Sequence, residues 1–217
     1  MVAAPEEDPG RDFPRRSREN TRARIVEAAA DVFAEKALRR VTVDDVVGAA
    51  GYTRGAFYSN FSGIDELFFD VYAHQTDLMI AAVREVVEGV SPEEFDFDSL
   101  GLVLGALRPF GRRWFLIQNE FAMLAVRDET ARETFKAESR RMQGSIEELV
   151  HAVLTLLERA PLVPMRHLTD TLIALCLHSL GNEQLETGGL DPQSLETDVL
   201  PKVVLGLSRP VDRPRGV

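Results

Sequence analysis

The residue types that could take part in recognition chemistry gather in one short segment near the N-terminus of the 217-residue chain. Residues 41–61 place Gly51 between two short stretches of helical character, which is the pattern of a helix-turn-helix. In such a motif the second helix brings its first residues to the major groove of DNA, where Arg54 can donate two hydrogen bonds to guanine. Thr53 can cap that helix and bond a phosphate, and Gly55 permits close approach of the backbone. An ordinary helical hairpin fits the same residues, and their physics alone leaves both interpretations open.

Small or polar side chains on the outer side of this segment are the candidate DNA contacts. Tyr58 and Asn60 suit phosphate oxygens, which position a protein on the duplex without reading its sequence. The complete candidate set is Thr42, Tyr52, Thr53, Arg54, Gly55, Tyr58, Ser59 and Asn60. The apolar side chains of the segment are expected to form the core of a three-helix domain, and they are Val43, Val46, Val47, Ala50, Phe57 and Phe61.

Other chemistries have little support in the sequence. Zinc sites need closely spaced ligands, whereas the four histidines are scattered at His74, His151, His167 and His178. Cys176 stands between leucines and is interpreted as a small core residue. No serine occurs in a nucleophile-elbow motif, and no strand precedes the glycines of residues 101–105 as a phosphate loop would require. We therefore expect no enzymatic activity, no metal and no cofactor.

The charge of the chain is divided unevenly along its length. The total is −10 with a pI near 5.0, which by itself argues against a nucleic-acid binder. Residues 11–63, however, carry ten basic and seven acidic side chains, a net of +3. Residues 1–10 have a net charge of −3 and residues 64–217 a net charge of −10. This asymmetry favours a different partner for each part of the chain, although a short segment with a +3 charge also arises by chance.

Composition predicts a soluble globular protein that acts in the cytoplasm. Hydrophobic residues make up 45% and charged residues 28%, ordinary values for a chain that buries a core. The N-terminus lacks the apolar segment of a signal peptide. The longest stretch without a charged side chain, Thr171 to Asn182, is too short to span a membrane.

Helical periodicity and capping signals predict an all-α chain. Ile25, Ala29 and Phe33 recur at helical spacing, and Thr42 to Asp45 has the form of a capped helix start. The expected helices run from residue 21 through 33 and over 42–50, 54–60, 64–88, 101–126 with an interruption near Pro109, 129–159, 165–187 and 193–207, with a further start at 91–94. The expected organisation is a disordered leader at 1–16, a helix-turn-helix DNA-binding domain at 17–63, a ligand-binding and dimerisation domain at 64–208 and a flexible tail at 209–217.

A set of residues in the first third of the chain follows a known pattern. They are Ile25, Ala28, Phe33, Thr42, Val43, Val46, Ala50, Gly51, Thr53, Phe57, Tyr58, Phe61 and Leu67. The run from Thr21 to Leu67 thereby resembles the N-terminal domain of TetR-family (TetR/AcrR-type) transcriptional regulators. Two residues depart from that pattern. Ala37 stands where family members usually have glycine after the first helix, and Ile64 stands where they commonly have a phosphate-binding lysine.

The resemblance implies a homodimer that binds a double-stranded DNA operator and responds to a small-molecule effector. Such a regulator is most often a repressor, and its last two long helices, here 165–187 and 193–207, pair with their copies in the dimer. The helix over 64–88 joins both domains and is the expected lever between them. Ile64 and the acidic total leave a second hypothesis open, a helical ligand-binding or interaction protein with weakened DNA binding.

Polar groups on otherwise apolar helix faces are the candidate effector contacts. The candidates are Trp114, Gln118, Phe121, Glu138, Met142 and His178. Apolar walls with a few polar groups are typical of ligand pockets, and this set would suit a hydrophobic or aromatic effector. Each polar group can equally be a residue at the edge of a face, or a buried group bonded to the backbone.

Overall fold

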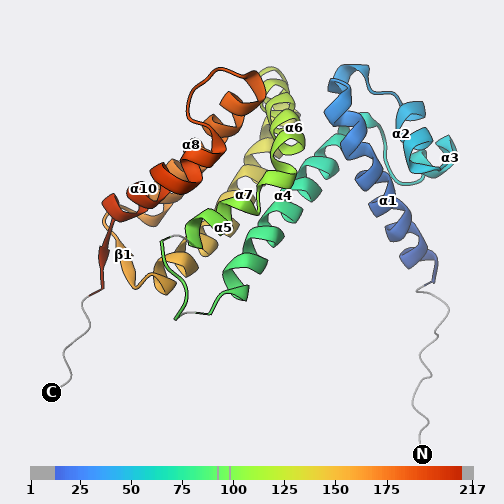
Figure 1. The fold of residues 1–217 in the computed structure, drawn as a ribbon. Helices are drawn as coiled ribbons and strands as arrows, with labels where there is room; N and C mark the ends of the chain where they lie inside the picture. Colours follow the sequence, from blue (N-terminus) through green and yellow to red (C-terminus); the bar gives the residue numbers. More distant parts are fainter. Residues whose placement is uncertain (1–12, 92, 98, 212–217) are drawn as a thin grey trace, which may run out of the picture. The chain divides into compact units, whose positions relative to one another are not determined.

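The computed structural model describes residues 13–91, 93–97 and 99–211 and consists almost entirely of helices (Figure 1). By their internal contacts the described residues divide into two compact units, with the boundary between residues 74 and 75. The helix α4 (Ile64–Gly89) contributes its beginning to the first unit and the rest to the second. The expected all-α class, with an N-terminal helix-turn-helix unit and a larger helical unit, is confirmed.

The N-terminal unit is built from α1 (Phe13–Glu35), a short 3₁₀ turn η1 (Leu38–Arg40), α2 (Val43–Ala50), α3 (Arg54–Tyr58) and the start of α4. Apolar residues at helical spacing give each helix one buried face, and these faces meet in a common core. Its fully buried side chains include Ile25 from α1, Val46 from α2, Phe57 from α3 and Leu67 from α4. Phe33 packs its ring edge-on against Phe68 with 5.1 Å between centroids, which joins α1 to α4.

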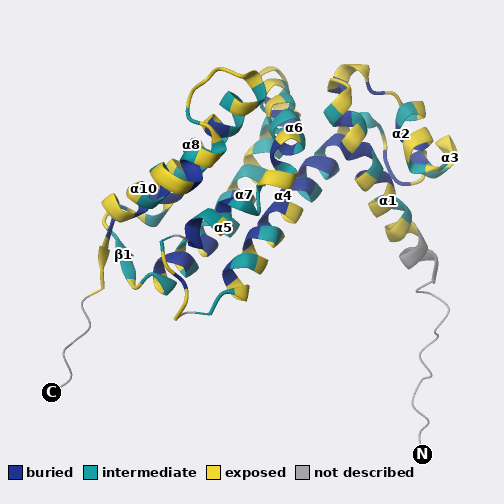
Figure 2. Ribbon diagram, in the orientation of Figure 1, coloured by how far each residue is buried: buried dark blue, intermediate teal, exposed yellow. Residues whose placement is uncertain are grey.

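The C-terminal unit contains the remainder of α4, followed by α5 (Ser99–Gly105), α6 (Arg108–Arg127), α7 (Glu129–Leu156), α8 (Met165–Leu185), α9 (Pro192–Ser194), a π-helical turn η2 (Leu195–Val199) and α10 (Leu200–Gly206). Buried residues line the inward faces of these helices (Figure 2). Asp128 caps α7 by accepting a 2.7 Å hydrogen bond from the Ala131 amide, and this cap separates α7 from α6.

Three differences from the expected elements have local causes. Residues 93 and 94 form a turn, and the next helix begins only at Ser99, whose amide and hydroxyl both donate to the Asp96 carboxylate. The last expected helix is divided, because Pro201 has no amide to donate to the carbonyl of Thr197 and the regular helical ladder gives way to the π turn. An antiparallel pair, β1 (Arg159–Pro161) with β2 (Ser208–Pro210), adds a two-stranded sheet.

The predicted domain boundaries stay predictions, although the structure bears on their ends. Helix α1 begins at Phe13, so residues 13–16 are helical where a leader was expected, and residues 1–12 lie outside the described residues. Residues 208–210 belong to β2, whereas 212–217 of the expected tail are not described. Within the part of the chain that the structure describes, no helix is both long and apolar enough to cross a membrane.

Candidate nucleic-acid interface and ligand cavity

A reciprocal capping arrangement fixes the start of α2. The Thr42 hydroxyl accepts a 3.2 Å hydrogen bond from the Asp45 amide, and the Thr42 amide donates to the Asp45 carboxylate at 2.9 Å. Lys36 reaches the same carboxylate from the end of α1 at 2.6 Å. The hydrogen bonds from Lys36 and Thr42 lower the pKa of Asp45 to about 2. Thr42, a candidate DNA contact, is therefore exposed but engaged in holding α2.

The turn between α2 and α3 depends on Gly51 and Thr53. Gly51 ends α2 in the left-handed conformation, with φ of 71°, where a side chain would be strained. The amide of the half-buried Tyr52 donates to the Val47 carbonyl at 3.0 Å, which closes the turn. Thr53 then caps α3 by accepting a 3.2 Å hydrogen bond from the Ala56 amide. These contacts define the direction in which α3 leaves the turn.

Five of the candidate DNA contacts lie together on the exposed side of α3. They are Thr53, Arg54, Gly55, Tyr58 and Ser59. Tyr58 is 60% exposed and rests edge-on against the buried Phe57 ring, with centroids 5.3 Å apart. A Cβ atom on Gly55 would meet only the Thr53 hydroxyl at 3.7 Å, so the surface beside it is open. The Ser59 hydroxyl bonds the Gly55 carbonyl at 2.9 Å.

The guanidinium of Arg54 is held by Asp44 across the turn. Its Nε donates to one carboxylate oxygen at 2.5 Å, and a terminal nitrogen donates to the other. The pair lowers the pKa of Asp44, and both side chains are well exposed. Exposed pairs contribute little to stability, so Arg54 can exchange this carboxylate for another acceptor.

Asn60 does not belong to the exposed set, which corrects the expectation that it faces outward. It is buried, and its side-chain amide donates to the Ala56 carbonyl at 2.8 Å. Its own carbonyl accepts a hydrogen bond from Arg22. The Asn60 side chain thus satisfies a carbonyl at the end of α3, the helix that it follows, and does not point to solvent.

Arg22 is a structural residue, although its charge counted toward the basic segment in the sequence. Its guanidinium lies over the Phe61 ring at 4.2 Å and donates to Asp70 at 2.8 Å and to Glu66 at 3.0 Å. These contacts join α1 to α4. Hydrogen bonds from the Ser62 amide and hydroxyl, followed by the contact with Arg22, lower the pKa of Glu66 to about 2.

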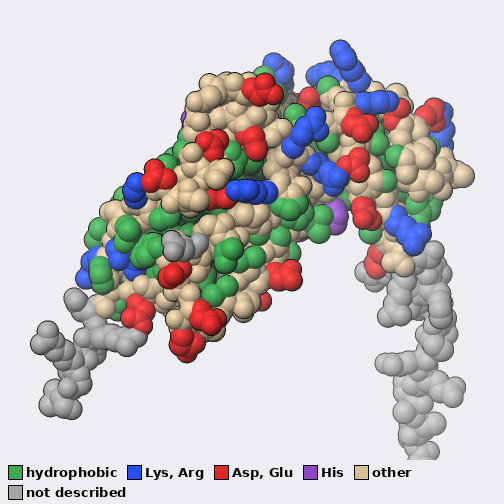
Figure 3. Space-filling model, in the orientation of Figure 1, with side chains coloured by type: hydrophobic (Ala, Val, Ile, Leu, Met, Phe, Trp, Pro, Cys, Tyr) green, Lys and Arg blue, Asp and Glu red, His purple; other side chains and the backbone are tan. Residues whose placement is uncertain are grey.

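Several basic side chains of the N-terminal unit are bonded to carboxylates. Arg22, Lys36 and Arg54 are each paired with carboxylates. Arg39 and Arg40 are exposed on η1. The face of this unit drawn in Figure 3 accordingly shows Lys and Arg interspersed with Asp and Glu.

The two departures from the family pattern have different structural consequences. Ala37 has φ of −55°, an unstrained value, so its replacement of glycine leaves the link between α1 and η1 relaxed. Ile64 opens α4, whose first turn carries Asp65 and Glu66 and no described basic side chain. The described residues of this first turn therefore offer a duplex phosphate no cation of their own, and the nearby Arg22 is bonded to Glu66 and Asp70.

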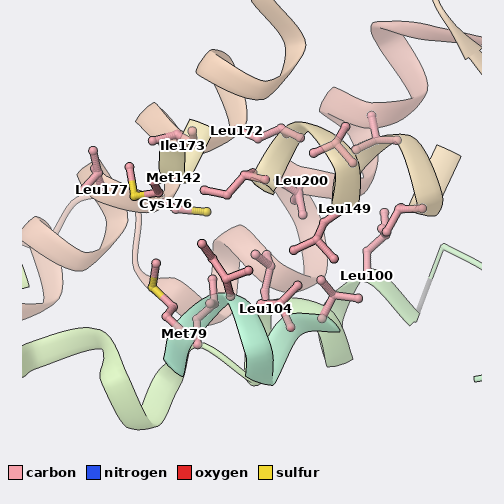
Figure 4. Close-up of a pocket in the computed structure, with 18 of the residues that line it drawn as sticks. Met79, Leu100, Leu104, Met142, Leu149, Leu172, Ile173, Cys176, Leu177 and Leu200 are labelled. Atoms are coloured by element: carbon pink, nitrogen blue, oxygen red, sulfur yellow. The ribbon is translucent and has the colours of Figure 1, made fainter. Parts of the chain in front are cut away.

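The C-terminal unit contains an apolar cavity of about 150 Å³ that is partly open to solvent. Helices α4, α5, α6, α7, α8 and α10 supply its walls, for example through Met79, Leu104, Leu149 and Leu200. The labelled side chains in Figure 4 end only in carbon or sulfur atoms. A cavity of this size holds about one aromatic ring and, when its walls are apolar, stays dry.

The cavity includes two of the six candidate effector contacts, Trp114 and Met142. The Trp114 indole donates its N–H to the Thr76 hydroxyl at 3.1 Å and is therefore satisfied without a ligand. The other four are not part of the wall that the described residues form. Phe121 is fully buried with its ring against Phe135, Glu138 bonds Arg141, His178 bonds Asn182 at the surface, and Gln118 is half-buried.

A second pocket, of about 300 Å³, adjoins the first and was not expected from the sequence. The two share wall residues Leu104, Leu107, Cys176 and Leu180. Unlike the first, the second has polar walls, which include Arg108, Ser179, Glu183 and Glu196. Burial raises the pKa of the shared Cys176 thiol to about 11, so this thiol is protonated at neutral pH. Arg108 and Glu196 lie 88 positions apart, and no local pattern could have joined them.

These features define a helix-turn-helix protein with a hollow helical second unit. The family profile "Bacterial regulatory proteins, tetR family" matches residues 25–71. The chain is similar to the HTH-type transcriptional repressor KstR2 of Mycobacterium tuberculosis, with 31% identity over 32% of this chain and 35% of that protein. It is also similar to the HTH-type transcriptional regulator TtgR of Pseudomonas putida, with 36% identity over 34% of this chain and 36% of that protein. The matches thus span about a third of each relative's length.

Solved structures extend the likeness in fold over most of the chain. The fatty acid degradation regulator FadR of Bacillus halodurans superposes with a TM-score of 0.65 at 14% identity, covering 94% of this chain and 98% of that one. A TetR-family member from Streptomyces coelicolor A3 gives 0.62 at 19% identity, covering 84% and 97%. Residues 25–71 thus match the N-terminal domain of the TetR family, as the sequence resemblance predicted, and the chain as a whole shares the fold of these solved structures.

Proposed function

We propose that this protein is a DNA-binding transcriptional repressor that leaves its operator when a small apolar ligand occupies the C-terminal cavity. The observation that carries the proposal is the capped α3, which presents Thr53, Arg54, Gly55, Tyr58 and Ser59 on one exposed surface. Several relatives of the N-terminal domain are named as repressors, which supports this direction of regulation. No catalytic role is proposed, and a protein that binds the chromosome acts in the cytoplasm.

On DNA, the first residues of α3 are the proposed base-reading group. Arg54 turns from Asp44 to guanine, where its two donors meet the O6 and N7 acceptors. Tyr58 and Ser59 bond phosphates on either side, and Gly55 allows the helix to approach the groove. Asn60 is excluded from this group because its side chain is turned inward.

The proposed operator-binding form is a homodimer. Two copies of α3 can then read half-sites separated by about one helical turn of DNA, roughly 34–36 Å. Helix α8 with the segment α9–η2–α10 is the proposed contact between copies. Leu185 and Leu205 support this assignment, since both are large apolar side chains exposed on these elements.

Helix α4 is the proposed link between ligand and DNA. It supplies Met79, Ile80 and Val83 to the cavity wall, and its first turns pack Leu67 and Phe68 into the N-terminal core. A ligand that fits only one position of α4 shifts the population toward that position. The ligand therefore acts by differential affinity for the two states and needs no contact with DNA.

Selection of duplexes from a genomic pool, followed by anisotropy titration of the best sequence, tests the function directly. Arg54→Ala is expected to weaken the selected duplex by roughly ten- to a hundredfold and to reduce discrimination against mismatched sites. The matched control is Arg112→Ala, which removes the same charge from an exposed position in α6. Asn60→Asp would be a poor control because it disturbs a buried amide. Absence of salt-dependent duplex binding at low salt would refute the proposed function and favour a ligand-binding protein without DNA activity.

A further inference from the structure

The apolar cavity and the polar pocket beside it form a continuous candidate site for one amphiphilic molecule. Four wall residues are common to both, so a ligand filling the first places its next atoms in the second. The first offers only apolar walls, which suit a chain or ring. The second offers charge and a hydroxyl, and its chemistry therefore decides which head group the ligand carries.

The wall of the second pocket contains an ion pair between Arg108 and Glu196, whose side chains differ in burial. Arg108 from α6 donates its Nε to Glu196 at 2.9 Å and a terminal nitrogen to the other carboxylate oxygen. The Glu196 side chain is only 9% exposed, whereas that of Arg108 is 57% exposed. Glu196 depends on a cation for its burial, while Arg108 can return to water with little loss.

The difference in burial between Arg108 and Glu196 favours a ligand of one charge over the other. An anionic head that recruited Arg108 would leave the buried Glu196 carboxylate unpaired, which is strongly unfavourable. A cationic head takes the place of Arg108 at Glu196 and releases the arginine to solvent. Glu183 and Asp191 also line this pocket, so carboxylates outnumber the single guanidinium among its described residues. The local charge therefore favours a cation.

A hydroxyl without a partner adds a second, independent indication. Ser179 of α8 is 1% exposed and lines the polar pocket, and its Oγ has no hydrogen-bond partner among the residues that the structure describes. Buried hydroxyls are almost always bonded, so one left free in a pocket wall is suited to receive a ligand donor. Glu196 lies in the π turn, a rare geometry that often marks functional sites.

We propose that the effector is a cationic amphiphile, an alkyl- or arylalkyl-ammonium whose apolar part fills the first cavity and whose N–H groups donate to Glu196 and Ser179. The inference rests on the proposed function, because it names the ligand of the site that would control DNA binding. It assigns Arg108 as the group that the ligand displaces.

Direct binding to the DNA-free protein tests the inference. Trp114, the only tryptophan of the chain, lines the cavity and reports occupancy through its fluorescence. The probes are octylammonium, octanoate and 1-octanol, each below its micellar concentration, with calorimetry as a second readout. Octylammonium is expected to bind at least about tenfold more tightly than octanoate, a ratio that one charge contact can supply. Equal affinities, tighter octanoate binding or no binding by any probe would overturn the inference.

Two variants locate the head group. Glu196→Gln is expected to reduce octylammonium affinity by about tenfold or more and to change 1-octanol affinity less than about twofold. Asp198→Asn removes a charge from the same π turn but at an exposed pair with Lys202, and it should leave both affinities unchanged. Ser179→Ala removes a hydroxyl without a partner, so it should fold normally while weakening octylammonium severalfold. An unchanged preference in Glu196→Gln would refute the assignment. Duplex binding is measured separately, so failure here does not imply failure of the proposed function.

Discussion

Thr169 offers a sharp test of the packing described for the C-terminal unit. It lies in α8, is fully buried, and its hydroxyl has no partner among the described residues. It lines neither pocket, so no ligand accounts for the free hydroxyl. Valine has the same shape and places a methyl group where threonine has its hydroxyl. We therefore expect Thr169→Val to stabilise the protein.

The magnitude follows from the burial of that one group. A buried hydroxyl without a hydrogen bond costs about 1–3 kcal/mol in proteins, and burying a methyl group gains about 0.8 kcal/mol. A helical threonine recovers part of this loss by moving its hydroxyl toward the carbonyl one turn earlier. The expected increase in the free energy of unfolding is therefore about 1–2 kcal/mol. For a chain of this length it corresponds to a rise in Tm of about 2–8 °C.

Urea unfolding followed by circular dichroism and by Trp114 fluorescence measures the effect. Thr171→Val is the matched control, because Thr171 lies one face away on α8, is exposed, and donates its hydroxyl to the His167 carbonyl at 2.8 Å. The control should change stability by less than about 0.5 kcal/mol. A destabilised Thr169→Val, or equal shifts in the two variants, would refute the described environment of this hydroxyl.

Three further predictions concern a turn, a carboxylate and a thiol. Gly51→Ala should destabilise the N-terminal unit by about 1–2 kcal/mol, because the φ of Gly51 is 71°. Gly48→Ala inside α2 has open space at its Cβ and should stabilise the unit by about 0.5–1 kcal/mol. Thermal unfolding of both variants tests whether the two effects have opposite signs. Glu66 has a pKa of about 2 in the fold against an ordinary 4.5, so its contribution is complete above pH 4.5 and is lost as pH falls toward 2; Glu66→Gln should flatten the acid side of the stability curve over that range. Cys176, with its pKa raised to about 11, should react with iodoacetamide at pH 8 only after unfolding, and rapid labelling of the native protein by mass spectrometry would contradict its burial.

The N-terminal unit was predictable because its determinants are local. The hydrogen bonds of Thr42, Gly51 and Thr53 reach only three or four positions along the chain, so a local sequence pattern is enough to predict them. Asn60 was expected to face outward, and the charge of Arg22 was counted without a partner, because neither the inward turn of the Asn60 side chain nor the pairing of Arg22 follows from residue type. Arg22 bonds Asp70, 48 positions away, and counting charges along the chain could not show that pairing.

The C-terminal unit was predictable only as a set of helices. Apolar stripes predicted α6, α7 and α8, and Trp114 and Met142, which stay candidate effector contacts, are buried on these helices. Which inward residues meet a cavity depends on how six helices leave space between them, and periodicity carries no information on that point. The π turn escaped prediction because the apolar spacing over residues 193–207 is that of one helix, and this spacing does not reveal how Pro201 changes the hydrogen bonds of the preceding turn.

Two free hydroxyls on one helix carry opposite meanings in this structure. Thr169 and Ser179 both lie in α8, are both buried, and both lack a partner among the described residues. Thr169 faces packed side chains, so valine should be the better residue there. Ser179 belongs to a pocket wall, so alanine should improve stability as well and yet weaken ligand binding. Experiment can therefore distinguish a hydroxyl that binds a ligand from one that does not. Both substitutions should raise stability, but only Ser179→Ala should also lower ligand affinity.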